Sequence, residues 1–299
     1  MDSGLVSIGL PAALAIIMFG LGLALTADDF RRVGSAPRPV VIALLAQLVL
    51  LPLLCFGLVL ALELEAILAV GMMLLAASPG GTTANLFSHL FRGDVALNIT
   101  LTAVNSVIAV VSLPLVVNFA VGWFDPAGAE DIGLQPAKTA QVFAIVLVPV
   151  AIGILVRRSS PAFAERADRP VRIASAVVLA LVIIGALLGE RENLGDYLAD
   201  IGLATVLFCA ASLAVGYTLP RLLGVPERQA LSSAFEVGIH NSTLAIAVAL
   251  SVLENDTLAV PAAVYGVLMF PLALLAGWLL TRGRKGGPGH ASGHRLPAL

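Results

Sequence analysis

Nine long apolar segments dominate the sequence and restrict the folds that it can adopt. A helix needs roughly 20 apolar residues to cross the hydrocarbon core of a bilayer, and each segment is close to that length or longer. The segments cover approximately residues 5–26, 38–61, 66–90, 94–123, 137–156, 171–189, 199–219, 229–252 and 257–281. Only 12% of the residues are charged, whereas soluble domains carry roughly 25%. The sequence therefore predicts an all-α polytopic membrane protein with nine transmembrane helices.

Composition also excludes several kinds of partner and site. A net charge of −2 and a pI near 6.1 argue against a nucleic-acid partner, which requires a basic surface. Cys55 and Cys209 stand singly in apolar segments, so we expect small buried side chains with no metal or redox role. The first segment lacks the basic start and cleavage site of a signal peptide, so we expect a retained span. The tail, residues 282–299, is expected to be disordered.

Basic residues are concentrated in alternate loops. Fifteen of the seventeen follow segments one, three, five and seven or lie in the tail. They are Arg31, Arg32, Arg38, Arg92, Arg157, Arg158, Arg166, Arg169, Arg172, Arg221, Arg228, Arg282, Arg284, Lys285 and Arg295. The remaining loops hold only Lys138 and Arg191 and are acidic. Because cytoplasmic loops are enriched in Lys and Arg, the pattern predicts an outside N-terminus and a cytoplasmic C-terminus. We expect an integral protein of a bacterial plasma (inner) membrane.

Glu236 is the only acidic residue inside an apolar segment, since the other eighteen lie in loops, at a terminus or at segment ends. An ionisable group at membrane depth is costly and usually marks an ion or substrate pathway. The alternative is a protonated glutamic acid whose hydrogen bonds only hold helices together. Because His240, Asn241 and Ser242 follow within six residues of Glu236, the sequence favours a functional site.

Two apolar segments contain residues that break helices. Segment three carries Pro79-Gly80-Gly81 at its middle, and segment eight carries Gly238 with polar residues just after it. Proline removes a backbone donor and glycine favours unwinding, and unwound backbone at membrane depth must be buried in protein or line a wet cavity. A kinked but continuous helix is the alternative for either segment alone. Two such segments together favour two broken helices.

The two interrupted segments face opposite ways across the membrane according to the loop charges. Each is followed by an apolar segment with an internal proline, Pro114 or Pro271. Segments one to four and six to nine therefore form a candidate inverted repeat, with segment five left over. Interrupted helices at matching positions of inverted halves indicate the binding site of a secondary transporter. Half-helix N-termini there face an anion, while unwound carbonyls and side-chain oxygens hold a cation.

Several polar side chains could supply oxygen to a cation at Glu236. The candidates are Gln47, Asn85, Asn98, Thr102 and Asn105. The last three are spaced four and three apart, so they share one face of their helix. Hydrogen bonding between helices is the alternative role for polar residues at these depths. We accept that alternative for Ser106 and Ser112, and it stays open for Asn105.

The same residues resemble the bile acid:sodium symporter family. The resemblance runs from "IIMFGLGLALTADDF" through "SPGGTTANLFSHLFRGDVALNITLTAVNS" to "FEVGIHNSTLAIAVAL". It implies a transporter domain over residues 1–281, in which a panel domain packs on a core domain where two broken helices cross. The panel would comprise about 5–26, 137–156 and 171–189, and the core about 38–123 and 199–281. This chain resembles the nine-span members.

The resemblance also implies two sodium sites. One would involve Ala84, Asn85, Asn98, Thr102 and Glu236. The other would involve Gln47, Glu236, the backbone oxygens of Val237 and Ile239, and the side chain of His240. Ala84 stands where relatives often have serine, and His240 where many have glutamine. Because imidazole is a poor sodium ligand, the second site could be weaker, reshaped or replaced by a proton.

Members of the family carry organic anions such as bile acids, sulfated steroids or small carboxylates. The anion would lie near the half-helix N-termini, at Thr82 and Thr83 and at Asn241 and Ser242. No arginine lies inside an apolar segment, so amides and hydroxyls would bind it. The bilayer and the anion are the expected partners, and no obligate protein partner is evident.

The predicted function is sodium-coupled symport of an organic anion by alternating access, with Na⁺ as the coupling ion. The first alternative is proton coupling through His240 and Glu236. An arsenite extruder would need a thiol at the crossing, where we expect neither Cys55 nor Cys209. A membrane enzyme would need a nucleophile paired with a base or a metal cluster, and we expect no catalytic residue. A channel or a sensor of the same architecture is a further alternative, excluded only by concentrative uptake.

Overall fold

The computed structural model describes residues 26–126, 136–167 and 194–282, with single residues and short pieces between 15 and 23 and between 170 and 177. The described residues are helical and contain one isolated β-bridge. Four of their helices are long and apolar enough to cross a membrane: Pro37–Ala61, Val95–Phe124, Ile201–Leu222 and Thr257–Thr281. This agrees with a polytopic membrane protein. The predicted segments 5–26 and 171–189 fall largely outside the described residues, and so does the tail after Arg282.

The first long helix contains a π-helical turn that positions a polar side chain. It consists of α3 (Pro37–Leu45), η1 (Ala46–Leu50) and α4 (Leu51–Ala61), and α2 (Ala27–Ser35) precedes it. Pro52 has no N–H to donate to the carbonyl four residues earlier, and the N–H of Leu51 donates instead to the carbonyl of Ala46. Such π-turns often mark functional positions. Gln47 lies in this turn and is 2% exposed.

Both predicted breaks are present. Segment three divides into α5 (Ala66–Ala77) and α6 (Thr82–Leu90), and segment eight divides into α12 (Glu227–Gly238) and α13 (Ser242–Ser251). The linkers are therefore residues 78–81 and 239–241. Pro79 lacks an N–H and cannot extend α5, and Gly81 starts α6 from an extended conformation.

The other helices match the predicted segments within a few residues. They are α7 (Val95–Phe124), α9 (Pro136–Ser159), α11 (Leu194–Leu222) and α14 (Val260–Thr281), with the 3₁₀ turn η2 (Thr257–Ala259) before α14. Asp94 caps α7 by accepting a hydrogen bond from the N–H of Leu97 at 3.1 Å. Pro114 and Pro271 lie inside α7 and α14, as predicted.

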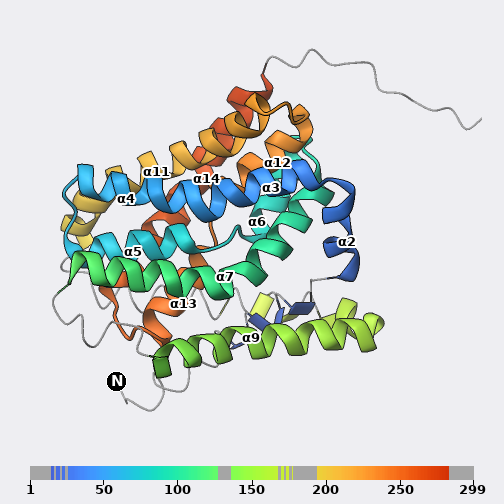
Figure 1. The fold of residues 1–299 in the computed structure, drawn as a ribbon, viewed down its shortest axis with the longest axis horizontal. Helices are drawn as coiled ribbons and strands as arrows, with labels where there is room; N and C mark the ends of the chain where they lie inside the picture. The colour runs from blue at the N-terminus through green and yellow to red at the C-terminus, as the bar shows by residue number, and fades with distance from the viewer. Residues whose placement is uncertain are drawn as a thin grey trace, which may run out of the picture.

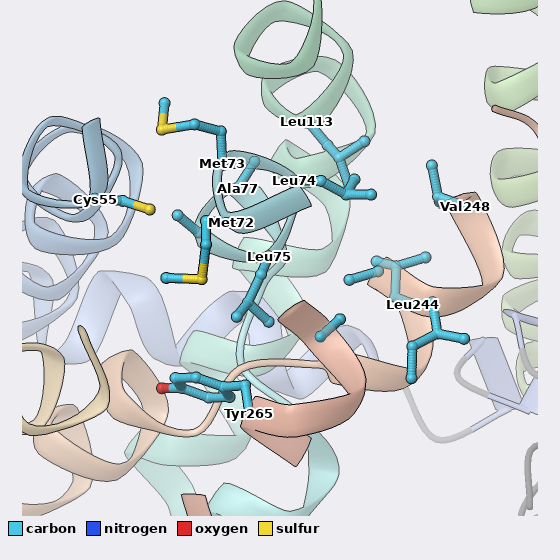
Figure 2. Packing of buried hydrophobic residues seen from close by; sticks show 14 of the residues in the cluster. Cys55, Met72, Met73, Leu74, Leu75, Ala77, Leu113, Leu244, Val248 and Tyr265 are labelled. Carbon is cyan, nitrogen blue, oxygen red and sulfur yellow. The ribbon is translucent and has the colours of Figure 1, made fainter. Parts of the chain in front are cut away.

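Helix α5 runs through the interior of the bundle. In Figure 1, α3–α4, α5–α6, α7 and α11 extend in similar directions, and α9 lies along one edge. Residues 68–77 of α5 are all buried. Figure 2 shows Met72, Met73 and Leu75 projecting from α5 among side chains of α4, α7, α13 and α14. A helix that is apolar and buried on all sides is central, whereas α4, α7 and α14 expose large apolar side chains such as Leu53, Leu115 and Val267.

The chain around Gly22 packs closely on α9. A Cβ atom added at Gly22 would overlap the carbonyl oxygen of Val150, and one added at Gly153 would meet the backbone of Gly22 and Phe19. Glycine permits such close approach between membrane helices. Two of the three segments predicted for the panel domain are therefore in contact. The panel as a whole stays a prediction, because its third segment lies outside the described residues.

Candidate functional site

The two helix breaks pair with each other through their backbones. Gly80 and His240 form an antiparallel β-bridge, in which the N–H of Gly81 donates to the carbonyl of Ile239 at 3.0 Å. The N–H of Asn241 donates to the carbonyl of Pro79 at 2.8 Å. Each linker thereby satisfies backbone groups that the other leaves free, as unwound backbone at membrane depth requires. The two broken helices are thus joined by backbone hydrogen bonds where they cross.

Glu236 lies in the last turn of α12 and is 0% exposed. Three side chains of α7 donate to its carboxylate: Asn98 Nδ2 to Oε2 at 2.8 Å, Thr102 Oγ1 to Oε2 at 2.6 Å, and Asn105 Nδ2 to Oε1 at 3.5 Å. All three donors are neutral, and no ion pair found among the described residues includes Glu236. We call these four residues the carboxylate site.

Gly80 forms the floor of the carboxylate site, which the sequence did not reveal. A Cβ atom added at Gly80 would overlap Oε1 and Cδ of Glu236, and it would lie 2.7 Å from the backbone oxygen of Glu236. In the sequence, Gly80 indicated only a helix break. In the structure it also lets the carboxylate pack directly on the crossing backbone.

A second polar cluster lies beside the crossing and consists of Gln47, Ser78 and His240, which we call the histidine site. Gln47 Nε2 donates to the carbonyl of Ser78 at 3.0 Å and lies 3.5 Å from His240 Nδ1. His240 Nδ1 lies 3.2 Å from the same carbonyl. The imidazole stacks on Phe208 at 5.2 Å and meets Tyr265 edge-on at 5.4 Å between ring centroids. Gln47 Oε1 and His240 Nε2 are buried without a hydrogen-bond partner in the described part of the chain.

The remaining predicted ion ligands lie at the crossing without bonding to Glu236. Ala84 is buried, and Asn85 is half-buried with Oδ1 lacking a partner among the described residues. Val237 and Ile239 are buried, and the Ile239 carbonyl accepts from Gly81, as described above. The structure therefore joins Asn98, Thr102 and Glu236 directly and places Gln47 against His240. Ala84 and Asn85 stay candidates on position alone.

The predicted anion-binding residues lie at the starts of α6 and α13. Thr83 is half-buried in the first turn of α6, and the side chain of Thr82 lies outside the described part. Asn241 caps α13, since its Oδ1 accepts from the N–H of Leu244 at 3.0 Å. Ser242 is 7% exposed, and its hydroxyl has no hydrogen-bond partner within the described residues. Ser242 is thus free to bind a ligand, whereas the oxygen of Asn241 is already used.

A small apolar cavity adjoins the crossing. Its volume is about 20 Å³, which is room for roughly one water molecule, so an organic anion would need a wider opening. Its lining comes from the first break, α7, α9, α13 and Met18. The residues are Met18, Pro79, Ser106, Ala109, Val110, Leu113, Pro114, Val150, Leu244 and Val248.

The expectation that neither cysteine lies at the crossing is wrong for Cys209. Its Sγ lies 3.8 Å from the carbonyl oxygen of Gly238, at the end of α12. The hydroxyl of Tyr265 donates to the same oxygen at 2.8 Å. The sequence could not indicate this because it depends on how α11 packs against α12. Both cysteines are nevertheless buried and free, as expected, and Tyr265 is a further residue at the crossing that the sequence did not single out.

The donor set suits a hard cation. Groups of three or more His, Cys, Asp or Glu that could hold a metal are absent from the described residues. The carboxylate site instead offers one carboxylate with hydroxyl and amide oxygens, and Asn85 adds a buried oxygen without a partner. Sodium and similar ions prefer oxygen ligands, whereas transition metals favour imidazole and thiolate. The residues present therefore fit a sodium ion.

Comparison with known proteins identifies the family. Residues 11–196 match the sodium bile acid symporter family. A Bacillus subtilis protein described as an uncharacterized sodium-dependent transporter is 31% identical over 255 residues, which are 85% of this chain and 77% of that protein. Human sodium/bile acid cotransporter 4 is 30% identical, over 79% of this chain and 54% of its own length. A probable chloroplastic sodium/metabolite cotransporter of Oryza sativa is 29% identical, over 86% of this chain and 60% of its own length. This chain belongs to the sodium bile acid symporter family.

Proposed function

We propose that the chain is a secondary transporter that couples sodium entry to uptake of an organic anion by alternating access. The observation that carries this proposal is the buried carboxylate of Glu236, which among the described residues is held by neutral donors alone, where two broken helices cross. A buried charge without a protein partner is costly, and a bound cation would offset it. The family is one of transporters, so the expectation that the chain is not an enzyme is confirmed.

One sodium ion would bind at the carboxylate site. Glu236 would supply charge and oxygen, and Thr102 and Asn98 would supply neutral oxygens. Asn85 and the backbone of Ala84, both in α6, would complete the coordination shell. Burial among helices α6, α7 and α12 is the support for this assignment. The second ion position would use Gln47, Glu236 and the backbone oxygens of Val237 and Ile239, with His240 beside them. The unpartnered Gln47 Oε1 supports it.

The anion would bind beside the crossing, where the N-termini of α6 and α13 end in Thr82, Thr83, Asn241 and Ser242. Helix N-termini carry free N–H groups and a partial positive charge. Relatives are named for cotransport of bile acid or of a metabolite, which supports a bile acid-like anion or a small carboxylate. The N-terminus would lie outside and the C-terminus in the cytoplasm of a bacterial plasma membrane, and the basic residues of alternate loops support this orientation.

The function is tested by thermal unfolding of the purified protein in sodium and in potassium at equal ionic strength. An ion that binds the folded state raises its stability by mass action, so sodium should raise the melting temperature selectively. Uptake of labelled taurocholate, pantoate or a keto acid into proteoliposomes should then require an inward sodium gradient. Stabilisation by about pH 6 relative to about pH 8, without sodium sensitivity, would favour the competing function of proton coupling through His240. A response to neither ion would contradict both.

Replacing Thr102 by Val should weaken apparent sodium affinity about tenfold or more, because valine has nearly the same shape but offers the ion no oxygen, and a polar contact with a charged group contributes about 1.5–3 kcal/mol. The measurement is a sodium titration of thermal stability. Thr100→Val is the matched control, since Thr100 is also buried in α7 but donates only to the carbonyl of Ala96. Equal affinity in the two variants would remove Thr102 from the site.

Replacing His240 by Gln should strengthen sodium binding at the second position, because an amide oxygen is a better sodium ligand than an imidazole nitrogen. We expect steeper sodium dependence of uptake and a several-fold lower half-saturating sodium concentration. His89→Gln is the control, since His89 is exposed at the end of α6. If neither the steepness nor the midpoint moves, His240 has only a structural role.

A further inference from the structure

Ser88 connects α6 to the carboxylate site. It is 0% exposed, and its hydroxyl donates to Oδ1 of Asn98 at 2.5 Å. Asn98 is also 0% exposed, and its Nδ2 donates to Glu236 Oε2 at 2.8 Å. The three residues form a chain of hydrogen bonds from the second half of one broken helix, through α7, to the first half of the other.

In this arrangement the amide nitrogen of Asn98, rather than its oxygen, faces Glu236, where a cation would bind. An amide nitrogen carries only donors, so it cannot bind sodium, whereas the amide oxygen can. Asn98 must turn its amide over to offer Oδ1 beside Glu236. Its Nδ2 then faces Ser88, whose hydroxyl can accept as well as donate. The hydroxyl hydrogen of Ser88 can at the same time go to a carbonyl four residues earlier in its own helix, at Ala84.

Thr102 has a similar second partner. Its hydroxyl lies 2.6 Å from Glu236 Oε2 and 3.0 Å from the backbone oxygen of Asn98. One hydroxyl hydrogen serves one acceptor at a time. When the Thr102 oxygen faces a cation, its hydrogen goes to the Asn98 carbonyl. Each of these two side chains of α7 can therefore present oxygen to an ion without leaving its own hydrogen unpaired.

We propose that Ser88 is a positioning residue of the sodium site, which acts through Asn98 by pairing with either end of its amide. This inference rests on the proposed function and adds a residue from α6 that does not touch the ion. Without the hydroxyl, turning the amide leaves a buried N–H unpaired. Proteins leave buried N–H groups unpaired more rarely than carbonyls. Removing the Ser88 hydroxyl therefore destabilises the ion-binding orientation of the Asn98 amide more than the orientation seen in the structure.

The test is a sodium titration of thermal stability for the full-length protein in detergent, with potassium keeping ionic strength constant. Ser88→Ala should weaken apparent sodium affinity about five- to tenfold, which is the loss expected for one unpaired buried donor. Ser212→Ala is the matched control, since Ser212 is buried and donates only to the carbonyl of Phe208 in its own helix. It should leave sodium affinity unchanged.

A double-mutant cycle separates action through Asn98 from a general packing effect. Asn98→Ser keeps a hydroxyl near Glu236 but removes the amide that Ser88 pairs with. In that background Ser88→Ala should change sodium affinity no further. An equal loss in both backgrounds, or no loss in either, would overturn the proposal. If Ser88→Ala does not fold, Ser88→Cys takes its place under the same criteria, because a thiol keeps the volume and bonds weakly.

Failure of the proposed function is visible separately. It would show in the unaltered protein as equal melting temperatures in sodium and potassium, before any variant is made, and the role of Ser88 would fall with it. Sodium stabilisation of the unaltered protein together with an unchanged Ser88→Ala affinity would overturn the role of Ser88 alone.

Discussion

Replacing Glu236 by Gln is expected to abolish sodium-dependent stabilisation and sodium-coupled uptake together. The carboxylate of Glu236 is completely buried, and its side-chain donors Asn98, Thr102 and Asn105 are neutral. Glutamine has nearly the same shape but no charge, so it no longer offsets the charge of a bound ion. A buried charge interaction of this kind is worth about 2–5 kcal/mol. Apparent sodium affinity and coupled uptake should therefore fall at least about 30-fold.

The variant should still fold, because the amide oxygen of Gln can accept the hydrogen bonds that Asn98 and Thr102 donate to Oε2. Its melting temperature in potassium checks this directly. Glu65→Gln is the control, since Glu65 is exposed before α5 and its side chain makes no capping hydrogen bond. Coupled uptake at the unaltered level in a folded Glu236→Gln protein would disprove the assignment of Glu236.

The sequence could predict the breaks and the helix bounds because their causes are local. Pro79 cannot donate to the preceding turn, and this is visible in one residue and its neighbours. Helix α7 was expected over 94–123 and is found at Val95–Phe124. The spacing of Asn98, Thr102 and Asn105 also predicted one shared face. The structure confirms it by aiming all three at Glu236.

The sequence could not predict contacts between residues far apart in the chain. Gly80 lies against Glu236, and Cys209 lies against the end of α12. Both depend on how helices cross, and a helical period carries no information on that. Nothing in the sequence distinguishes Ser88 from other small residues of the apolar segments. Its role becomes visible only in its 2.5 Å contact with Asn98. The polar residues were therefore predictable, but their mutual geometry was not.

Asn105 shows the same limit at one residue. Its spacing placed it on the correct face, but the sequence left open whether it served the ion or another helix. Its Nδ2 lies 3.5 Å from Glu236 Oε1, and its Oδ1 is buried without a partner in the described part of the chain. It therefore belongs to the carboxylate site. Its unpartnered Oδ1 makes Asn105 a further candidate ligand for the proposed ion.

The crossing also explains why the helix breaks and the candidate ion ligands occur together. The bridge between Gly80 and His240 holds both linkers at one point. Ser78 lies in the first linker and Glu236 in the last turn of α12, both shortly before the bridge, and α7 lies alongside with its polar face. A shift of either broken helix would therefore alter the carboxylate site and the histidine site together. In the proposed function, this shared backbone contact would couple ion binding to helix movement.

Replacing Gly80 by Ala should disable the site more severely than its size suggests. The added Cβ would overlap Oε1 and Cδ of Glu236 and lie 2.7 Å from its backbone oxygen. The backbone of Gly80 is not in the left-handed region, so alanine is allowed by conformation and the effect is steric. Overpacking of this kind costs about 1–3 kcal/mol. Sodium affinity and coupled uptake should each fall at least about tenfold, with a lower melting temperature in potassium.

Gly57→Ala is the matched control for this prediction. Gly57 lies in α4, and a Cβ added there would meet no atom within 4 Å. Alanine favours a helix over glycine by roughly 1 kcal/mol, so this variant should be at least as stable as the unaltered protein and transport normally. If Gly80→Ala kept both its melting temperature and its sodium affinity, the carboxylate of Glu236 would have to lie away from the crossing backbone. The assignment of the carboxylate site to this crossing would then fail, because that assignment depends on the contact between Glu236 and Gly80.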